Sequence, residues 1–273
     1  MKFIRLATIA ALSTTIVAGT ATAVSADEVR EVTTEGQVQF RSAGEEDGEL
    51  EVLPPEVDPD VEIEPEIPGT TGPLSIVKAA TMNFGTQVIS NQDQRYNMVA
   101  EMARLANPDE DGPTEVPYIS FAQVQDVRGT NAGWDLQVSL SDFTSDTQNN
   151  VLTGAEIEFV GSRIQYEGTN MDNAPSAHQD GLKLSPTTGA RSVMTASNGQ
   201  GAGASSVVWG NQAELNAQFA DDEVETVTNN AIQLFIPGST AKDATTYTST
   251  LSWELTSTPG EDGPGETDPE IDA

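Results

Sequence analysis

Cysteine is absent from this chain of 273 residues. The absence excludes disulfide bonds, a cysteine-linked lipid anchor, thiol catalysis and any metal site built from cysteine ligands. Stability must therefore come from a hydrophobic core, and that core has to be sizeable because no cross-links supplement it. Aromatic residues are also scarce, at eight Phe, four Tyr and three Trp, so they can supply only a limited part of this core.

Basic residues are few. Twelve Lys and Arg accompany forty-three Asp and Glu, which gives a formal net charge of −31 at pH 7. Such a chain lacks the cations that neutralise nucleic-acid phosphates, and it lacks the basic patch that binds an anionic membrane. We therefore expect no nucleic acid among its partners.

Long hydrophobic runs are absent after residue 26, where no segment approaches the roughly eighteen apolar residues that span a bilayer. Before that point, a basic start and an uncharged apolar run at 6–23 lead into Val24–Ala26, whose small residues suit a signal peptidase. This pattern predicts a signal peptide at 1–26, with cleavage after Ala23 as an alternative. The exported protein would then have no membrane span, and without an LPxTG sorting signal its retention on a cell would be non-covalent.

Two segments have compositions that do not favour a core. Residues 27–72 carry fifteen acidic and two basic residues, with prolines every few positions from Leu53 onward. This predicts an extended acidic linker, which acts either as a solvated spacer or as an interaction arm. Within it, residues 36–41 alternate and form a possible edge strand. Residues 260–273 contain acidic residues, Gly and Pro but no base, and predict a disordered tail.

Residues 73–259 consist of short alternating stretches separated by Gly, Pro, Asn and Asp. This pattern predicts an all-β fold, a single β-sandwich-like domain of antiparallel strands with long loops. The strands are expected at 74–77, 116–127, 133–140, 155–160, 162–166, 191–195, 205–209, 231–236 and 246–256.

Two stretches are helical candidates instead of strands. Tyr96–Ala106 places Met98, Met102 and Leu105 at a spacing of about 3.6 residues, and Asn211–Ala220 is the second candidate. The long loops at 168–190 and 197–204 are the segments that we expect to carry recognition, as loops on a β-scaffold commonly do.

Catalytic and metal-binding motifs have little support. His178 is the only histidine, lies in a polar loop and has no GxSxG nucleophile to serve, so we expect it to be solvated. Gly199–Ala204 resembles a phosphate loop only superficially, because it lacks a strand–loop–helix context. Asp142–Asp146 and Asp221–Glu223 offer carboxylates without the spacing of a calcium loop. We expect no catalytic residue, no metal and no cofactor.

Two Trp–acid–Leu triplets are the most specific feature of the chain. They are Trp134-Asp135-Leu136 and Trp253-Glu254-Leu255, and both lie in stretches that alternate with a period of two. The tryptophans are either core residues or platforms for sugar rings, and the alternation favours the core. The binding surface would then lie in the loops or on the polar face, with Asp135 and Glu254 pointing outward.

The flanks of these triplets point to a family. The stretch 125–139, with its Asp-x-Arg-Gly-Thr lead-in, and the stretch 234–255 resemble the first and closing motifs of the WxL-domain surface proteins of low-GC Gram-positive bacteria. Asn83–Gly85 is similar to the early Phe-Gly of that family, and the resemblance covers about residues 73–259.

The resemblance implies a secreted protein held non-covalently at the cell surface by peptidoglycan, alongside other surface proteins of the same system. It implicates both triplets in attachment, either as sugar contacts or as core: Trp134, Asp135, Leu136, Trp253, Glu254 and Leu255. The alternative is a structural or adhesive component that binds partner proteins or host ligands. We do not expect an enzyme, although a secreted glycan hydrolase needs only two suitably placed carboxylates.

Overall fold

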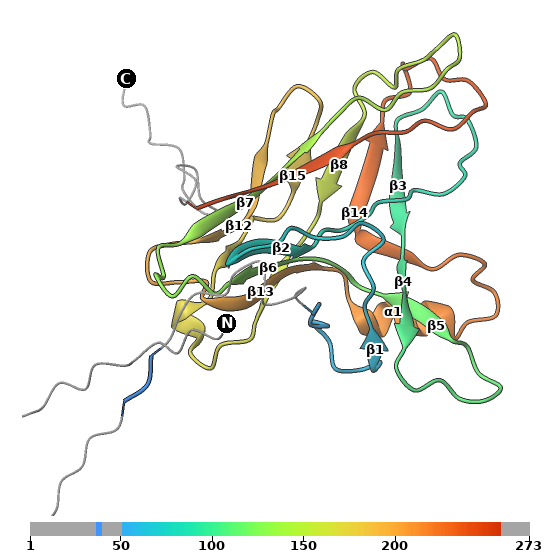
Figure 1. Ribbon diagram of the computed structural model, residues 1–273. Coiled ribbons are helices and arrows are strands. Elements are labelled where there is room, and N and C mark those ends of the chain that lie inside the picture. Colours follow the sequence, from blue (N-terminus) through green and yellow to red (C-terminus); the bar gives the residue numbers. More distant parts are fainter. Residues whose placement is uncertain (1–36, 40–50, 258–273) are drawn as a thin grey trace, which may run out of the picture. The chain divides into compact units, whose positions relative to one another are not determined.

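The computed structural model describes residues 37–39 and 51–257 (Figure 1). The predicted signal peptide and acidic tail lie outside the described residues. Of the possible edge strand at 36–41, only 37–39 is described, and these residues are exposed and belong to no strand. They fall in a unit formed by residues 1–40, whereas all the elements below belong to a second unit, 41–273.

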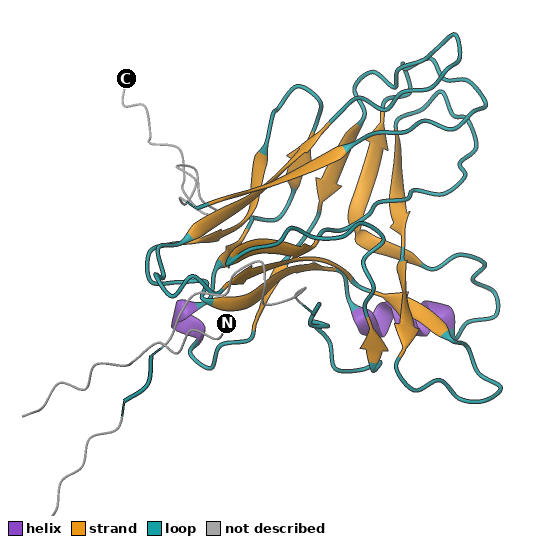
Figure 2. Ribbon diagram, viewed as in Figure 1, coloured by secondary structure: helices purple, strands orange, loops and turns teal. Residues whose placement is uncertain are grey.

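The described residues form an all-β structure, as the sequence predicts, with fifteen strands that pair only in the antiparallel sense and one α-helix (Figure 2). The strands form four small sheets, however, and not the expected single sandwich. In spatial order the sheets are β1 (Val61–Glu62), β4 (Glu101–Leu105), β5 (Glu115–Tyr118); β10 (Ser176–Ala177), β12 (Arg191–Ala196), β7 (Trp134–Leu140), β15 (Leu251–Thr256); β11 (Leu182–Leu184), β8 (Glu156–Phe159), β14 (Thr228–Ile236), β3 (Gln94–Val99); and β2 (Leu74–Lys78), β6 (Ser120–Asp126), β13 (Gly203–Trp209), β9 (Arg163–Tyr166).

The structure has more sheets than a sandwich because one long extended segment pairs with different neighbours along its length. The expected strand 116–127 divides at Ile119 into β5 and β6, which belong to different sheets. The backbone N–H of Ile119 donates to the side chain of Gln212 at 3.1 Å, and Gln212 begins helix α1 (Gln212–Phe219). A side chain thus occupies the place that a neighbouring strand would otherwise take, because a buried N–H needs a partner.

One helical candidate is confirmed and the other is wrong. Helix α1 begins after Asn211, whose side chain accepts hydrogen bonds from the first-turn N–H groups of Ala213 and Glu214. The stretch Tyr96–Ala106 instead forms most of β3 and all of β4. Its apparent helical period fails because Met98 is fully buried, whereas Met102 is 53% exposed.

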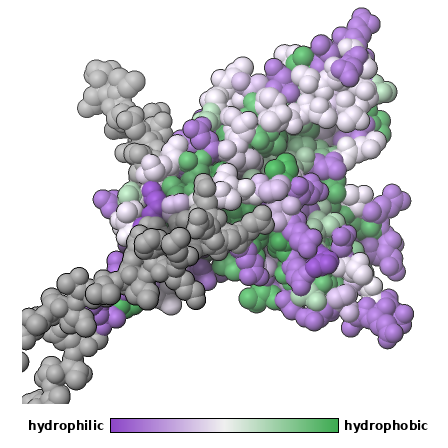
Figure 3. All heavy atoms as spheres, viewed as in Figure 1, coloured by the Kyte–Doolittle hydropathy of each residue, from purple (hydrophilic) through white to green (hydrophobic). Residues whose placement is uncertain are grey.

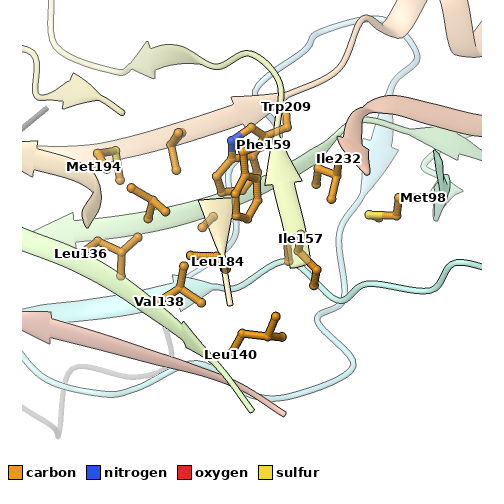
Figure 4. Close-up of a cluster of buried hydrophobic side chains, with 14 of the residues drawn as sticks. Met98, Leu136, Val138, Leu140, Ile157, Phe159, Leu184, Met194, Trp209 and Ile232 are labelled. Carbon is orange, nitrogen blue, oxygen red and sulfur yellow. The ribbon is translucent and has the colours of Figure 1, made fainter. Parts of the chain in front are cut away.

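The sheet β2-β6-β13-β9 is covered on both faces. One face contributes Ala122, Val124, Val207 and Trp209 to a large core that it shares with the β10-β12-β7-β15 and β11-β8-β14-β3 sheets (Figure 4). The opposite face contributes Val77, Phe121 and Val208 to a smaller core beneath β1, β4, β5 and α1. Strands buried on both sides lose the alternation of apolar and polar residues, which is the reason that β6 and β13 contain long buried runs.

The end of the predicted linker packs on this smaller core. Val52 and Val61 are buried in it, and Leu53 exchanges two backbone hydrogen bonds with the side chain of Gln123. Both the N–H and the C=O of Glu56 bond to the hydroxyl of Tyr118. Residues 51–63 are therefore not the extended solvated spacer that their prolines and charges predict.

The expected loop 168–190 also contains paired backbone. It includes a short 3₁₀ helix, η2 (Met171–Asn173), and the strands β10 and β11. Strand β10 pairs with β12 and β11 pairs with β8. Part of this segment consequently belongs to the scaffold.

Candidate functional site

The two Trp–acid–Leu triplets lie side by side on paired strands. Strand β7 carries the first triplet and its antiparallel neighbour β15 carries the second, with Trp253 opposite Val138 and Leu255 opposite Leu136. Two motifs more than a hundred residues apart in the sequence therefore belong to one sheet. Their side chains, however, do not form a common exposed surface.

Trp134 is fully buried, and its indole is enclosed by the glycine-rich loop that precedes β13. The indole Nε1–H donates to the carbonyl of Gly201 at 3.0 Å. Gly201 has a φ of +75°, and a Cβ at this position would lie 2.6 Å from Trp134 Nε1 and 2.5 Å from Ala196 Cβ. The phosphate-loop-like stretch 199–204 therefore packs against a tryptophan, and this tryptophan is not available to a ligand.

Asp135 is fully buried, so the expectation that it points outward is wrong. Its carboxylate accepts hydrogen bonds from Thr195 Oγ1 at 2.7 Å, from Ser192 Oγ at 2.8 Å and from the side chain of Gln137. Ser192 and Thr195 lie on β12, so the acid fixes β7 to its neighbour in the sheet. A buried carboxylate is tolerated here because several donors replace its lost water.

The second triplet is more accessible than the first. Trp253 and Leu255 are half-buried, and Glu254 is exposed. The Trp253 ring packs against Trp209, with ring centroids 6.3 Å apart and an angle of 50° between the planes. Glu254 thus points outward as expected, and Trp253 contributes to the edge of the large core.

Trp209 is at the centre of an aromatic cluster that the sequence did not reveal. Its ring lies beside Phe159, with centroids 4.7 Å apart (Figure 4). Its Nε1–H donates to Nε2 of His178 at 2.8 Å, and Nδ1 of His178 donates to the carbonyl of Gln179 at 2.6 Å. The imidazole is therefore neutral, with its proton on Nδ1.

The expectation of a solvated His178 is consequently wrong. The residue directly follows β10 and its side chain is buried beside Phe159 and Trp209, and this burial lowers its pKa because charging the ring would cost solvation energy. A buried, hydrogen-bonded histidine next to two aromatic rings is a structural residue. Its loop contains mainly polar neighbours in sequence, which gave no sign of this role.

The Asp-x-Arg-Gly-Thr lead-in forms a clamp before the first triplet. Arg128 makes a bidentate pair with the buried carboxylate of Asp126, at 2.9 Å from Nε and 2.7 Å from Nη2. The same Nη2 donates to the carbonyl of Gly133, one residue before Trp134. The clamp closes a turn with left-handed backbone at Gly129, Asn131 and Gly133, and so sets the start of β7.

A cavity that none of the tryptophans lines is bounded by three loops, which gather at the upper right of Figure 1. We call it the loop groove. Its cavity has a volume of about 880 Å³ and is bounded by segments 82–89 and 242–249 as its two lips. Its floor is apolar and is formed by Phe84, Phe143, Leu152, Ile157, Leu234 and Ile236.

The lips of the loop groove are held by polar contacts. The Nζ of Lys242 donates to the carbonyls of Ser90, Pro237 and Thr240 at 2.9, 3.3 and 3.0 Å. Asp243 accepts two hydrogen bonds from Asn149, one from its backbone and one from its side chain, which lower the pKa of Asp243. These contacts connect the loop before β3, the loop after β7 and the loop before β15.

Tyr247 completes this connection. Its hydroxyl donates to the carbonyl of Asn149 at 2.6 Å and accepts from the backbone N–H of Asp243 at 2.9 Å. The stretch between the closing Pro-Gly and the second triplet therefore shapes the groove. Sequence reasoning selected Asn83–Gly85 and this closing stretch as family features, but it did not place them together.

Neither a metal cluster nor a membrane-spanning helix occurs in the part of the chain that the structure describes. There, no three His, Asp or Glu side chains are grouped to hold a metal ion. No helix in the same residues is long and apolar enough to cross a membrane.

A β-domain with pinned loops around a neutral, open groove has the features of a binding domain. The chain belongs to the WxL domain surface cell wall-binding family, whose model matches residues 27–259. This confirms the resemblance, and it places the protein in a family of wall-binding surface domains, which is not a family of enzymes. The match begins before residue 73 and includes the packed segment 51–63. No curated protein and no solved structure matches the chain.

Proposed function

We propose that the protein is exported and attaches non-covalently to the bacterial cell wall by binding peptidoglycan. The observation that carries this proposal is the family match over residues 27–259, which describes surface cell-wall binding. The organisation that follows is a signal peptide at 1–26, an acidic linker, a wall-binding domain that extends to residue 259 and an acidic tail at 260–273.

Burial supports a structural role for both triplets. Trp134, Asp135 and Leu136 are fully buried, so they support the domain without contacting wall polymer. Trp253 and Leu255 are half-buried at the edge of the same core, and only Glu254 is exposed. These positions support a role for the triplets in maintaining the scaffold, with the wall bound at another surface of the domain.

Sedimentation with purified peptidoglycan tests this proposal. We expect the protein without its signal peptide to sediment with the wall material. The Trp134→Ala variant should lose both fold and binding, because truncating a buried tryptophan costs about 3–5 kcal/mol. The Trp253→Ala variant should keep its fold, measured by circular dichroism and thermal melting, and should still sediment. If Trp253→Ala remains folded but no longer binds, the second triplet is itself the contact surface.

The alternative, a structural or adhesive component that binds partner proteins, is favoured by one observation. Val88 and Ile89 are adjacent and are 88% and 55% exposed, and consecutive exposed apolar residues often mark protein contacts. This alternative predicts sedimentation only with walls that still carry their surface proteins. Sedimentation with protein-free peptidoglycan separates the two functions.

A further inference from the structure

We propose that the loop groove is the wall-binding site and that it takes the uncharged glycan strand, a polymer of N-acetylated hexosamines. This inference rests on the proposed function and specifies its site and ligand. It excludes the peptide stems and the anionic polymers of the wall as the groove's primary ligand.

Charge is the first reason. In a chain with a net charge of −31, the charged side chains that line the groove are one cation, Lys242, and one anion, Asp243. Both are engaged within the protein, Lys242 with three carbonyls and Asp243 with Asn149. The two formal charges of the lining cancel in sum, and both groups already make hydrogen bonds within the protein, so an uncharged ligand is the electrostatic complement of the groove.

The chemistry of the lining is the second reason. The apolar floor includes the rings of Phe84 and Phe143, and the rings of Tyr96 and Tyr247 are partly exposed beside it. The partly exposed faces of Tyr96 and Tyr247 suit the C–H surface of a sugar ring, and the apolar floor accepts the methyl of an acetamido group.

The lips add the polar groups that sugar hydroxyls require. They carry uncharged hydroxyl and amide side chains from both sides: Asn83, Thr86, Gln87, Thr245, Thr246 and Thr248. In Figure 3 the tip of the upper loops is hydrophilic, and the surface below this tip is mostly pale with hydrophobic residues among the pale ones. A mixed apolar and neutral polar lining of this kind fits amphipathic sugars.

Size and rigidity are the third reason. A cavity of about 880 Å³ lies within the range of pockets that hold small organic ligands, roughly 300–1,000 Å³. Lys242 bonds to Ser90, next to the other lip, and Asp243 and Tyr247 bond to Asn149 in the loop after β7. Binding therefore does not have to order the loops first, and this lowers the entropic cost of association.

The decisive variant places a carboxylate on each lip. Val88 is 88% exposed and Thr246 is exposed, so Val88→Asp with Thr246→Glu changes the groove without opening the core. The matched control is Val57→Asp with Thr169→Glu, which adds the same charge at a 94% exposed valine and an exposed threonine outside the groove. Both variants should have the melting temperature of the unmodified chain.

The measurements are sedimentation with protein-free peptidoglycan and calorimetry with a soluble oligomer of N-acetylglucosamine. The groove variant should bind both ligands about tenfold more weakly or worse, because a carboxylate in an uncharged site loses solvation without gaining a partner. The control variant should bind like the unmodified chain, and the soluble oligomer should compete with the wall.

Three results would overturn the inference while leaving wall binding intact. They are equal sedimentation of the groove variant, competition by stem peptides but not by the oligomer, and a binding loss seen only with walls that retain their proteins. The last result would assign the groove to a protein partner. Failure of the unmodified chain to sediment with any wall preparation would instead overturn the proposed function itself.

Discussion

At the scale of single residues, Gly201 packs closely on the indole of Trp134. A Cβ at Gly201 would meet both the indole nitrogen and the Cβ of Ala196 at less than 3 Å, and its φ is positive. We expect Gly201→Ala to lower the free energy of unfolding by about 2–4 kcal/mol, because strain and overpacking add. Urea denaturation measures this loss.

Gly199 is the matched control for that prediction. Its φ is also positive, at +90°, but a Cβ at this position would have no atom within 4 Å. Gly199→Ala should therefore cost only the backbone strain, about 1 kcal/mol. Equal losses for the two variants would contradict the close packing of Gly201 on the tryptophan.

His178 makes stability depend on pH in a narrow window. Burial lowers its folded-state pKa below the usual 6.5, so the unfolded chain binds this proton more readily than the folded chain. The contribution of neutral His178 to the free energy of unfolding is complete above about pH 6.5. It is lost as the pH falls toward the folded-state pKa, and the free energy of unfolding then changes by up to about 1.4 kcal/mol per pH unit.

This dependence can be measured because His178 is the only histidine in the chain. Urea midpoints should fall between about pH 7.5 and 5.5, above the range in which most carboxylates titrate. A His178→Gln variant keeps a polar side chain without an imidazole, and its midpoint should be nearly constant in this window. An equally steep fall in that variant would assign the effect to other groups.

At the scale of elements, the segment 51–63 behaves as part of the domain. Tyr118 holds it through two hydrogen bonds to the backbone of Glu56, and burial raises the pKa of the Tyr118 hydroxyl to about 12. Tyr118→Phe should reduce the free energy of unfolding by about 1–3 kcal/mol, because the N–H of Glu56 loses its partner. Hydrogen exchange at Glu56 should also become faster.

Tyr166→Phe is the control for this element, since Tyr166 lies on β9, where it pairs with Ser205 of β13, and has no such contact with the segment. Its stability should stay within about 0.5 kcal/mol of the unmodified chain. Unchanged exchange at Glu56 in Tyr118→Phe would show that the Tyr118 hydroxyl does not hold the segment.

Strand β7 shows how far the period-two alternation predicts which side chains share a face. The alternation places Trp134, Leu136 and Val138 on one face of a strand, and the three side chains do point together into the large core. The expectation that Asp135 points outward is wrong. Alternation separates the two faces of a strand, but it does not tell which of these faces other elements cover. Residues of β12 supply the donors to Asp135, and no local pattern on β7 announces them.

At the scale of the whole molecule, net charge should shape wall binding. A chain of −31 repels the anionic polymers of a wall, and a neutral groove gains nothing from their charge. Raising NaCl from about 10 to 300 mM screens the repulsion, so sedimentation with walls should stay constant or increase. A steady decrease over this range would show that attraction between opposite charges drives binding.

The sequence by itself determined the all-β class, most strand positions and the family, because period-two alternation and motif spacing are local properties. The division into four sheets, the burial of Asp135 and His178, and the packing of residues 51–63 depended on the tertiary structure. So did the loop groove, whose lips are about 150 residues apart in the chain. Alternation defines the two faces of a strand, but only the elements that pack against each face decide what is covered and what remains open to a ligand.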